Sequence, residues 1–144
     1  MMIGKTVAQY KIVEQLGEGG MGVVYKAEDL HLGRTVALKF LAPHAAEDSE
    51  SKTRFLREAR TAASLDHPNV CTVYDIGEAD GKPFFAMALI EGQTLKDTIA
   101  ERPLRLEVAL DIAIQAGQGL AVAHERGIIH RDVKSANLMI TPEG

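Results

Sequence analysis

The sequence predicts an α+β fold in which antiparallel strands fill the first ninety residues and helices follow. From Tyr10 onward, runs rich in β-branched and aromatic residues alternate with short turns. Asp80-Gly81 stands between two such runs and is a strong hairpin signal. From Leu106 to Arg126, apolar residues recur instead at helical spacing.

Five strands and one helix are expected before residue 91. The helix is expected from about Glu50 to Leu65, with Asp48 or Ser49 near its cap, after a polar loop from Pro43 to Ser51. Each strand is a short run bounded by turn residues, and the early strands, joined by short turns, form an antiparallel meander. The expected strands are Tyr10 to Leu16, Val23 to Ala27, Thr35 to Leu41, Val70 to Ile76 and Pro83 to Ile90.

After residue 90 the pattern changes. Glu91-Gly92 interrupts the strands and is expected to form a hinge. Thr94, with Asp97 three residues later, predicts a capping box that opens a short helix to about Glu101. A final strand is expected from Leu138 to Thr141.

The longest helix is expected from Leu106 to Arg126, closed by Gly127. Gly117 and Gly119 lie inside it, where a glycine costs roughly 1 kcal/mol relative to alanine, so close packing is expected at both. One face carries an apolar stripe, which comprises Ala109, Ile112, Ala113, Ala116, Leu120 and Ala123.

Composition narrows the class of protein. A chain of 144 residues with 46% hydrophobic and 25% charged residues is an ordinary globular domain. The net charge of −4 gives no reason to expect a nucleic-acid partner. Cys71 is the single cysteine, which excludes an internal disulfide framework and favours a cytoplasmic location. The apolar run from Phe84 to Ile90 is too short to span a membrane, so no membrane segment is expected.

Gly17 to Val24 (GEGGMGVV) fits the spacing G-x-G-x-x-G-x-V. A dinucleotide-binding loop has similar glycines but must open a helix, whereas Val23 to Tyr25 favours a strand. A Walker loop is excluded because Val23 stands where its lysine is needed. The preferred interpretation is a hairpin whose bare amides lie over phosphates, and an ordinary glycine-rich turn is the alternative.

Val36 to Lys39 (VALK) lies on a predicted strand. A lysine on an alternating strand is usually solvated, and that is the alternative interpretation here. Lys39 shares its side of the strand with Ala37, however, and a small residue there suits a ligand. An inward lysine needs an anion and a carboxylate partner, and Glu58 on the predicted helix can supply the carboxylate.

His130 to Asn137 (HRDVKSAN) is the most specific stretch. It places a carboxylate, an ammonium and an amide between two short apolar runs, which hold a polar loop at the edge of a core. A lone aspartate or asparagine here is usually a turn residue, but the spacing matches H-R-D-L-x-x-x-N, with Val133 in place of leucine.

With these motifs in this order, the sequence resembles a protein kinase, specifically a bacterial Hanks-type Ser/Thr kinase, from about Tyr10 onward. The resemblance implies a five-stranded antiparallel N-lobe with one helix in residues 1–90. It also implies a hinge at about 88–92 and the beginning of a helical C-lobe in residues 91–144.

The resemblance implies that the protein transfers the γ-phosphoryl group of ATP, with Mg²⁺, to a Ser or Thr of a protein substrate. It gives Asp132 the role of orienting the acceptor hydroxyl and taking its proton, and Lys134 that of neutralising the γ-phosphate. Lys39, held by Glu58, binds the α- and β-phosphates, and Asn137 holds Mg²⁺. The nucleotide-binding residues that it implies are Leu16, Gly17, Glu18, Gly19, Gly22, Val24, Ala37, Lys39, Met87, Ala88, Ile90 and Met139.

Two departures from the family pattern matter. Ala88-Leu89 stand where the family often has Glu-Tyr, which costs little because the contacts there are main-chain. The 144 residues contain no Asp-Phe-Gly, so alone they are expected to be inactive and poorly stable, with the Leu138 to Thr141 strand lacking its returning partner. The alternative is a non-catalytic nucleotide-binding or protein-interaction module.

Overall fold

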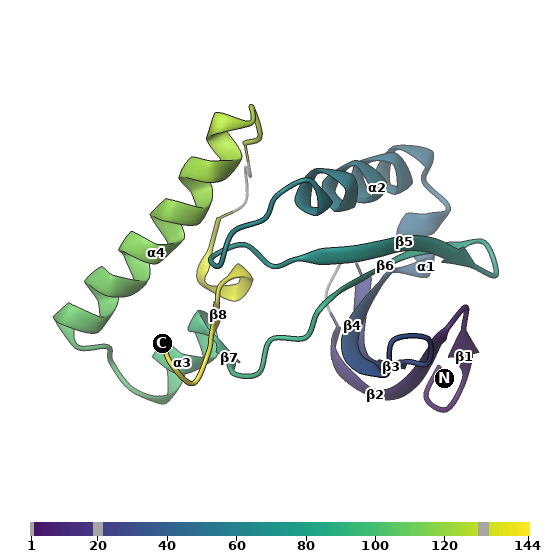
Figure 1. Cartoon of the computed structure of the whole chain (residues 1–144), viewed down its shortest axis with the longest axis horizontal. Helices are drawn as coiled ribbons and strands as arrows, with labels where there is room; N and C mark the ends of the chain where they lie inside the picture. Colours follow the sequence, from purple (N-terminus) through teal and green to yellow (C-terminus); the bar gives the residue numbers. More distant parts are fainter. Residues whose placement is uncertain (1, 19–21, 130–132) are drawn as a thin grey trace. The chain divides into compact units, whose positions relative to one another are not determined.

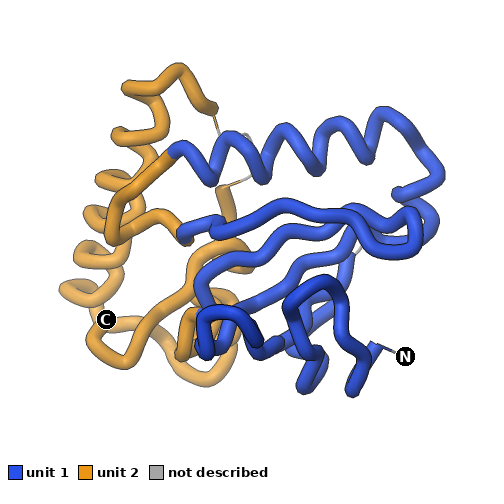
Figure 2. The backbone as a smooth tube through the Cα atoms, turned by 45° about the vertical axis from the view of Figure 1, so that its right-hand side comes forward, with its two compact units in different colours: residues 1–64, 72–89 blue, residues 65–71, 90–144 orange. Residues whose placement is uncertain are grey.

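The computed structural model describes residues 2–18, 22–129 and 133–144. The chain divides into two compact units, shown in different colours in Figure 2. Unit 1 comprises residues 1–64 and 72–89, and unit 2 comprises residues 65–71 and 90–144. The main division falls at residue 89, one residue before the predicted one, and the segment 65–71 belongs to the second unit although it lies early in the chain.

Unit 1 is built on an antiparallel sheet of six strands in the order β1-β2-β3-β4-β6-β5 (Figure 1). The sequence predicted five. The additional strand, β1, is too short to show any periodicity, and it pairs with β2 through a turn in which Ala8 has a φ of 51°. The strands are β1 (Thr6–Val7), β2 (Tyr10–Glu18), β3 (Gly22–Asp29), β4 (Arg34–Leu41), β5 (Val73–Ala79) and β6 (Lys82–Ala88).

The turn predicted between the last two strands is confirmed. Asp80 and Gly81 connect β5 to β6 with φ values of 51° and 75°. Two successive positive φ values are typical of the type I′ turn, whose twist matches that of the flanking strands. Strand β5 begins three residues later than predicted, because Val70 still belongs to a turn in which its N–H donates to the carbonyl oxygen of His67.

The two faces of the sheet carry different residues. The core face buries an aromatic and aliphatic cluster in which Phe40 and Phe84 lie 5.2 Å apart, centroid to centroid. The opposite face, called the helix face below, is covered in part by α2 (Ser49–Ala63). The core-face cluster comprises Val7, Tyr10, Ile12, Tyr25, Ala27, Val36, Leu38, Phe40, Phe84 and Ala86.

Tyr10 joins strands that are not neighbours in the sheet. Its hydroxyl donates to Oδ2 of Asp75 over 3.1 Å, from β2 to β5, so the sheet curls to bring these strands together. Its ring packs edge-on against Phe84. Burial, the hydrogen bond to Asp75 and the negative charge of that carboxylate raise the pKa of Tyr10 above its usual range.

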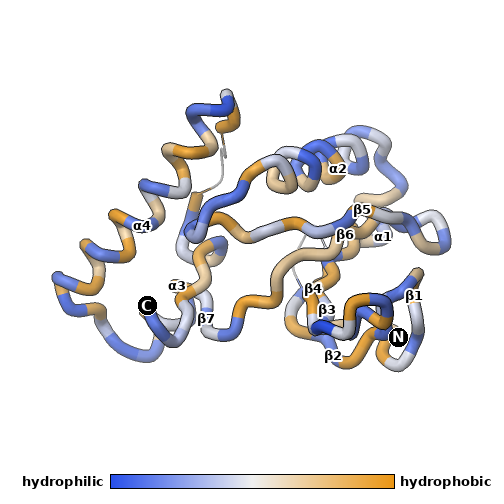
Figure 3. The backbone as a smooth tube through the Cα atoms, in the orientation of Figure 1, coloured by the Kyte–Doolittle hydropathy of each residue, from blue (hydrophilic) through white to orange (hydrophobic). Residues whose placement is uncertain are grey.

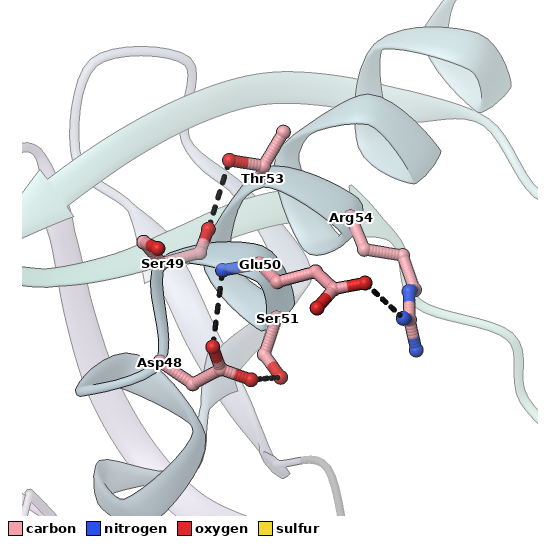
Figure 4. A network of polar contacts seen from close by, with 6 residues as sticks. All are labelled: Asp48, Ser49, Glu50, Ser51, Thr53 and Arg54. Atoms are coloured by element: carbon pink, nitrogen blue, oxygen red, sulfur yellow. Dashed lines mark hydrogen bonds and ion pairs between the residues drawn. The ribbon is translucent and has the colours of Figure 1, made fainter.

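Helix α2 begins where the sequence indicated. Asp48 is the N-cap residue and accepts from the N–H of Glu50, while its other oxygen accepts from the Ser51 hydroxyl (Figure 4). The hydrogen bond from Ser51, and to a smaller extent that from Glu50, lowers the pKa of the Asp48 carboxyl. The loop predicted before α2 contains a short helix, α1 (Pro43–Ala46). This helix is a single turn that begins with proline, a residue favoured at the first position of a helix.

Unit 2 carries the remaining elements. They are β7 (Gln93–Thr94), α3 (Leu95–Glu101), α4 (Leu106–Glu125), the 3₁₀ turn η1 (Ser135–Asn137) and β8 (Met139–Ile140). The cap of α3 is confirmed, because the Thr94 hydroxyl accepts from the N–H of Asp97. The final strand is also present, but it is paired with β7, a partner that the sequence did not indicate.

Helix α4 buries little of itself. Its buried residues are Gly119 and Ala123, while Leu106, Leu110 and Ile114 are exposed, so apolar positions recur along its length in Figure 3. Close packing accounts for Gly119, where a Cβ would lie 2.8 Å from the carbonyl oxygen of Asn69, but not for Gly117, which meets nothing within 4 Å. Among the described helices, α4 is long and apolar enough to cross a membrane by length and composition, a test that the core helix of a globular domain also passes.

Candidate functional site

The strand register of unit 1 assembles the site residues predicted on the sheet. Val24 of β3 pairs with Gly17 of β2 on one side and with Lys39 of β4 on the other. Lys39 pairs in turn with Phe85 of β6. Directly opposed residues of antiparallel strands lie on the same face, so this register forms one row of residues across four strands, with side chains at Val24, Lys39 and Phe85 and none at Gly17.

A second row lies beside the first on the same face. Ala37 pairs with Lys26 of β3 and with Met87 of β6. Strand residues two apart share a face, which places Ala37 beside Lys39 and Met87 beside Phe85. The helix face is therefore defined here by Val24, Lys26, Ala37, Lys39, Phe85 and Met87. Leu16 falls in an irregular stretch of β2 between Gln15 and Gly17, with its side chain 46% exposed.

The two described glycines of the glycine-rich motif differ in what requires them. A Cβ at Gly22 would overlap the carbonyl oxygen of Phe40, so packing against β4 excludes any side chain there. A Cβ at Gly17 would meet no atom within 4 Å, so packing within the described chain does not require that glycine. Glu18 pairs with Val23. Gly19 lies outside the described residues.

Lys39 and Glu58 form no ion pair in the structure. Within the described part of the chain, the ion pairs are Lys52–Glu78 and Arg54–Glu50. Glu58 is exposed on α2, and the ammonium of Lys39 lies 5.9 Å from the centre of the Phe85 ring. The predicted contact between Lys39 and Glu58 is thus not present in this conformation, although both residues belong to unit 1.

The predicted hinge begins at the end of β6. The backbone N–H of Ala88 donates to the carbonyl oxygen of Thr72 over 2.8 Å. A purine hydrogen-bonding to this segment would therefore use its other backbone atoms. Ile90 belongs to unit 2, so the division between the units falls within the predicted hinge.

The predicted catalytic loop is described from Val133 onward. His130, Arg131 and Asp132 lie outside the described residues. Lys134 is extended and precedes η1, and the N–H of Asn137 donates to the carbonyl oxygen of Lys134, which closes this turn. Both side chains are exposed, as is that of Met139 on β8.

Strand β8 is held by backbone contacts within unit 2. The N–H of Leu95 donates to the carbonyl oxygen of Leu138 over 2.7 Å. Gly92 has a φ of 145°, and a Cβ there would overlap the carbonyl oxygen of Ile140. These contacts fix the backbone that follows Asn137. Asn137 is the residue that the resemblance implies as the Mg²⁺ ligand.

Sequence reasoning missed Phe85. Its side chain is 8% exposed and it stands two residues before Met87, so strand periodicity alone places it on the same face. Its position opposite Lys39 depends on the pairing of β4 with β6, and these strands are separated in the chain by α1, α2 and β5. No local pattern in the sequence specifies that register.

Comparisons with known proteins identify the family. Residues 10–144 match the model of the protein kinase domain. The chain is 45% identical over 146 aligned positions to the serine/threonine-protein kinase PrkC of Bacillus subtilis, covering 100% of this chain and 22% of PrkC. It is 44% identical over 138 positions to the serine/threonine-protein kinase PknB of Mycobacterium tuberculosis, covering 92% of this chain and 22% of PknB.

Solved structures agree with the sequence matches. The kinase domain of Mycobacterium tuberculosis PknI superposes with a TM-score of 0.88 at 38% identity, covering 98% of this chain and 57% of that one. This chain thus spans about a fifth of the length of PrkC and PknB. The sequence motifs, the antiparallel sheet and these matches together show that the chain belongs to the protein kinase domain family.

Proposed function

We propose that this chain carries the nucleotide-binding sheet and the catalytic loop of a kinase that transfers the γ-phosphoryl group of ATP to Ser or Thr residues of proteins. The observation that carries the proposal is the row Gly17–Val24–Lys39 on the helix face, with Ala37 and Met87 in the next row. The names of PrkC and PknB, both serine/threonine-protein kinases, support the choice of acceptor.

The two rows suit a nucleotide because they place the cation of Lys39 beside small and apolar residues. Val24, Ala37 and Met87 offer an apolar surface to a purine, and the small side chain of Ala37 leaves room for a ring. The ammonium of Lys39 is half-buried beside them and is available to phosphate oxygens. A Cβ at Gly17 meets no protein atom, so backbone can approach a phosphate there.

The catalytic loop supplies the remaining groups. Asp132 would orient the acceptor hydroxyl and accept its proton, and the Lys134 ammonium would neutralise charge on the transferred group. Asn137 offers an amide oxygen, a ligand type that suits Mg²⁺, and its side chain is exposed. When bound, Mg²⁺ neutralises phosphate charge, and Asn137 would hold the ion at the end of η1.

Nucleotide binding tests the first half of the proposal. Mg·ATP titrated into the 144-residue chain should bind, and Lys39→Met should abolish most of that affinity while the melting temperature stays nearly unchanged. Lys11→Met is the matched control, because Lys11 is an exposed strand lysine outside the rows of the helix face. Equal affinity in the wild type and Lys39→Met would contradict the assignment of Lys39.

Transfer to protein tests the second half, and it is measured in the complete gene product. Asp132→Asn should lower kcat by about 10²- to 10⁴-fold, the usual contribution of a general base, with little change in nucleotide affinity. Phosphoamino-acid analysis should find phosphoserine or phosphothreonine. Predominant phosphotyrosine would contradict the proposed acceptor, and nucleotide binding without any transfer would favour a non-catalytic nucleotide-binding module.

A further inference from the structure

The ammonium of Lys39 lies over an aromatic ring. Its Nζ atom is 5.9 Å from the centroid of Phe85, at the outer limit of the distances at which a cation and a ring attract each other. Strand register causes this contact, because the two residues are directly opposed on β4 and β6 and project from the same face. Lys39 forms no ion pair with any other residue that the structure describes.

The same ring also packs against a residue of helix α2. The rings of Phe55 and Phe85 lie 5.1 Å apart, centroid to centroid, at an angle of 42°. Both are almost fully buried, at 5% and 8% exposure, in a cluster that includes Leu41 and Val73. Phe55 stands one helical turn before Glu58. A ring packed this closely cannot move far unless α2 moves too.

We infer that Phe85 is a positioning residue for Lys39, and that it couples the position of α2 to that of the lysine through Phe55. The ring holds the flexible lysine side chain on the helix face before a phosphate binds. Less side-chain conformational entropy is then lost on nucleotide binding, so the entropic cost of binding is smaller. A displacement of α2 would shift Phe85 through Phe55 and release the ammonium. The inference rests on the proposed role of Lys39 in binding phosphates.

The contact itself can be tested without nucleotide. In the 144-residue chain, the ε-methylene protons of Lys39, assigned by their absence in Lys39→Met, should be shifted upfield by the ring current of Phe85. Phe85→Leu and Phe85→Met should both remove that shift, and Phe85→Tyr should retain it. Phe84→Leu is the matched control, because Phe84 is the adjacent ring but projects from the core face. An unchanged Lys39 shift in Phe85→Leu or Phe85→Met would overturn the inference.

The proposed coupling between α2 and Lys39 is tested with a separate variant, Phe55→Leu. Phe55→Leu removes the ring that packs on Phe85 from the helix and leaves Lys39 and Phe85 in place. We expect the ring-current shift of Lys39 to decrease without disappearing. A shift identical to that of the wild type would overturn the coupling between α2 and the lysine.

The functional consequence is measured as Mg·ATP affinity. Phe85→Leu should weaken binding about two- to fivefold, as expected for losing one cation–π contact at a partly exposed site. Phe85→Tyr and Phe84→Leu should bind like the wild type.

A double mutant separates an effect through Lys39 from an effect on the fold. In a Lys39→Met background, Phe85→Leu should cause no additional loss of Mg·ATP affinity. The same loss in both backgrounds would show that the ring acts on the fold and would overturn the inference. Absence of wild-type binding would contradict the proposed function, while the ring-current measurement would still decide the contact.

Discussion

The two faces of the unit 1 sheet are made from alternate residues of the same strands, yet these residues differ in burial and in their proposed roles. On the core face, Leu38 and Ala86 have no exposed surface and Phe84 is 1% exposed. On the helix face, Lys39 and Met87 are only half-buried, although each is one residue away from a core residue. At Lys39 and Met87, strand periodicity thus separates stability from binding, so substitutions of these residues and of their neighbours Leu38 and Ala86 should have different effects.

The largest expected effect is on the core face. Phe84→Ala should destabilise unit 1 by about 3–5 kcal/mol, the usual cost of removing a buried phenylalanine side chain. Phe84 packs against both Tyr10 and Phe40, so the resulting cavity cannot close without disturbing three strands. Urea unfolding followed by far-ultraviolet circular dichroism measures the loss. A loss below 1 kcal/mol would contradict the assignment of Phe84 to the core.

Two glycines of the glycine-rich motif, Gly17 at the end of β2 and Gly22 at the start of β3, sharpen the comparison. Gly22→Ala should destabilise the sheet by about 1–3 kcal/mol, because the new Cβ overlaps the Phe40 carbonyl oxygen and the strands must separate. Gly17→Ala should change stability by no more than about 0.5 kcal/mol. Thermal unfolding of the two variants, carried out in parallel with the wild type, measures these changes in stability. Equal losses would show that both glycines serve packing, against the proposed role of Gly17.

The smallest effect concerns Tyr10 and depends on pH. Tyr10→Phe should cost about 0.5–1.5 kcal/mol near pH 7, where the hydroxyl donates to Asp75. The folded state raises the pKa of Tyr10, so the folded chain retains a proton that the unfolded chain loses above about pH 10. The wild type's advantage over Tyr10→Phe should therefore be complete below pH 10 and decrease as pH rises beyond it. Denaturant unfolding of both proteins from pH 7 to 11 measures this difference; an advantage that grows with pH would contradict the account.

Local signals in the sequence predicted much of this fold. The type I′ turn at Asp80-Gly81, the cap at Asp48 and the length of α4 all follow from residues close together in the chain. The sequence did not predict β1, α1 and β7, because elements of two to four residues show no periodicity.

The residues of the candidate site were proposed from the sequence one at a time, but their arrangement was not. Motif spacing indicated Val24 and Lys39, and the family resemblance implied Met87, yet their rows depend on a register that passes through two irregularities in β2 and across the non-sequential pair β4 and β6. The ring of Phe85 opposite Lys39 is visible only once that register is known. Long-range pairing of strands is set by tertiary packing, which is why the motifs alone did not indicate it.

The most direct measurement uses methyl groups as reporters of the two faces. Chemical shifts of ¹³C-labelled methyl groups in the 144-residue chain are followed while Mg·ATP is added. The account predicts that the methyl signals of Val24, Ala37 and Met87 on the helix face move. It also predicts that those of Leu38 and Ala86, which stand next to Ala37 on β4 and Met87 on β6 but are buried on the core face, stay in place. Movement confined to the core-face methyl groups, or no movement on either face at saturating Mg·ATP, would contradict it.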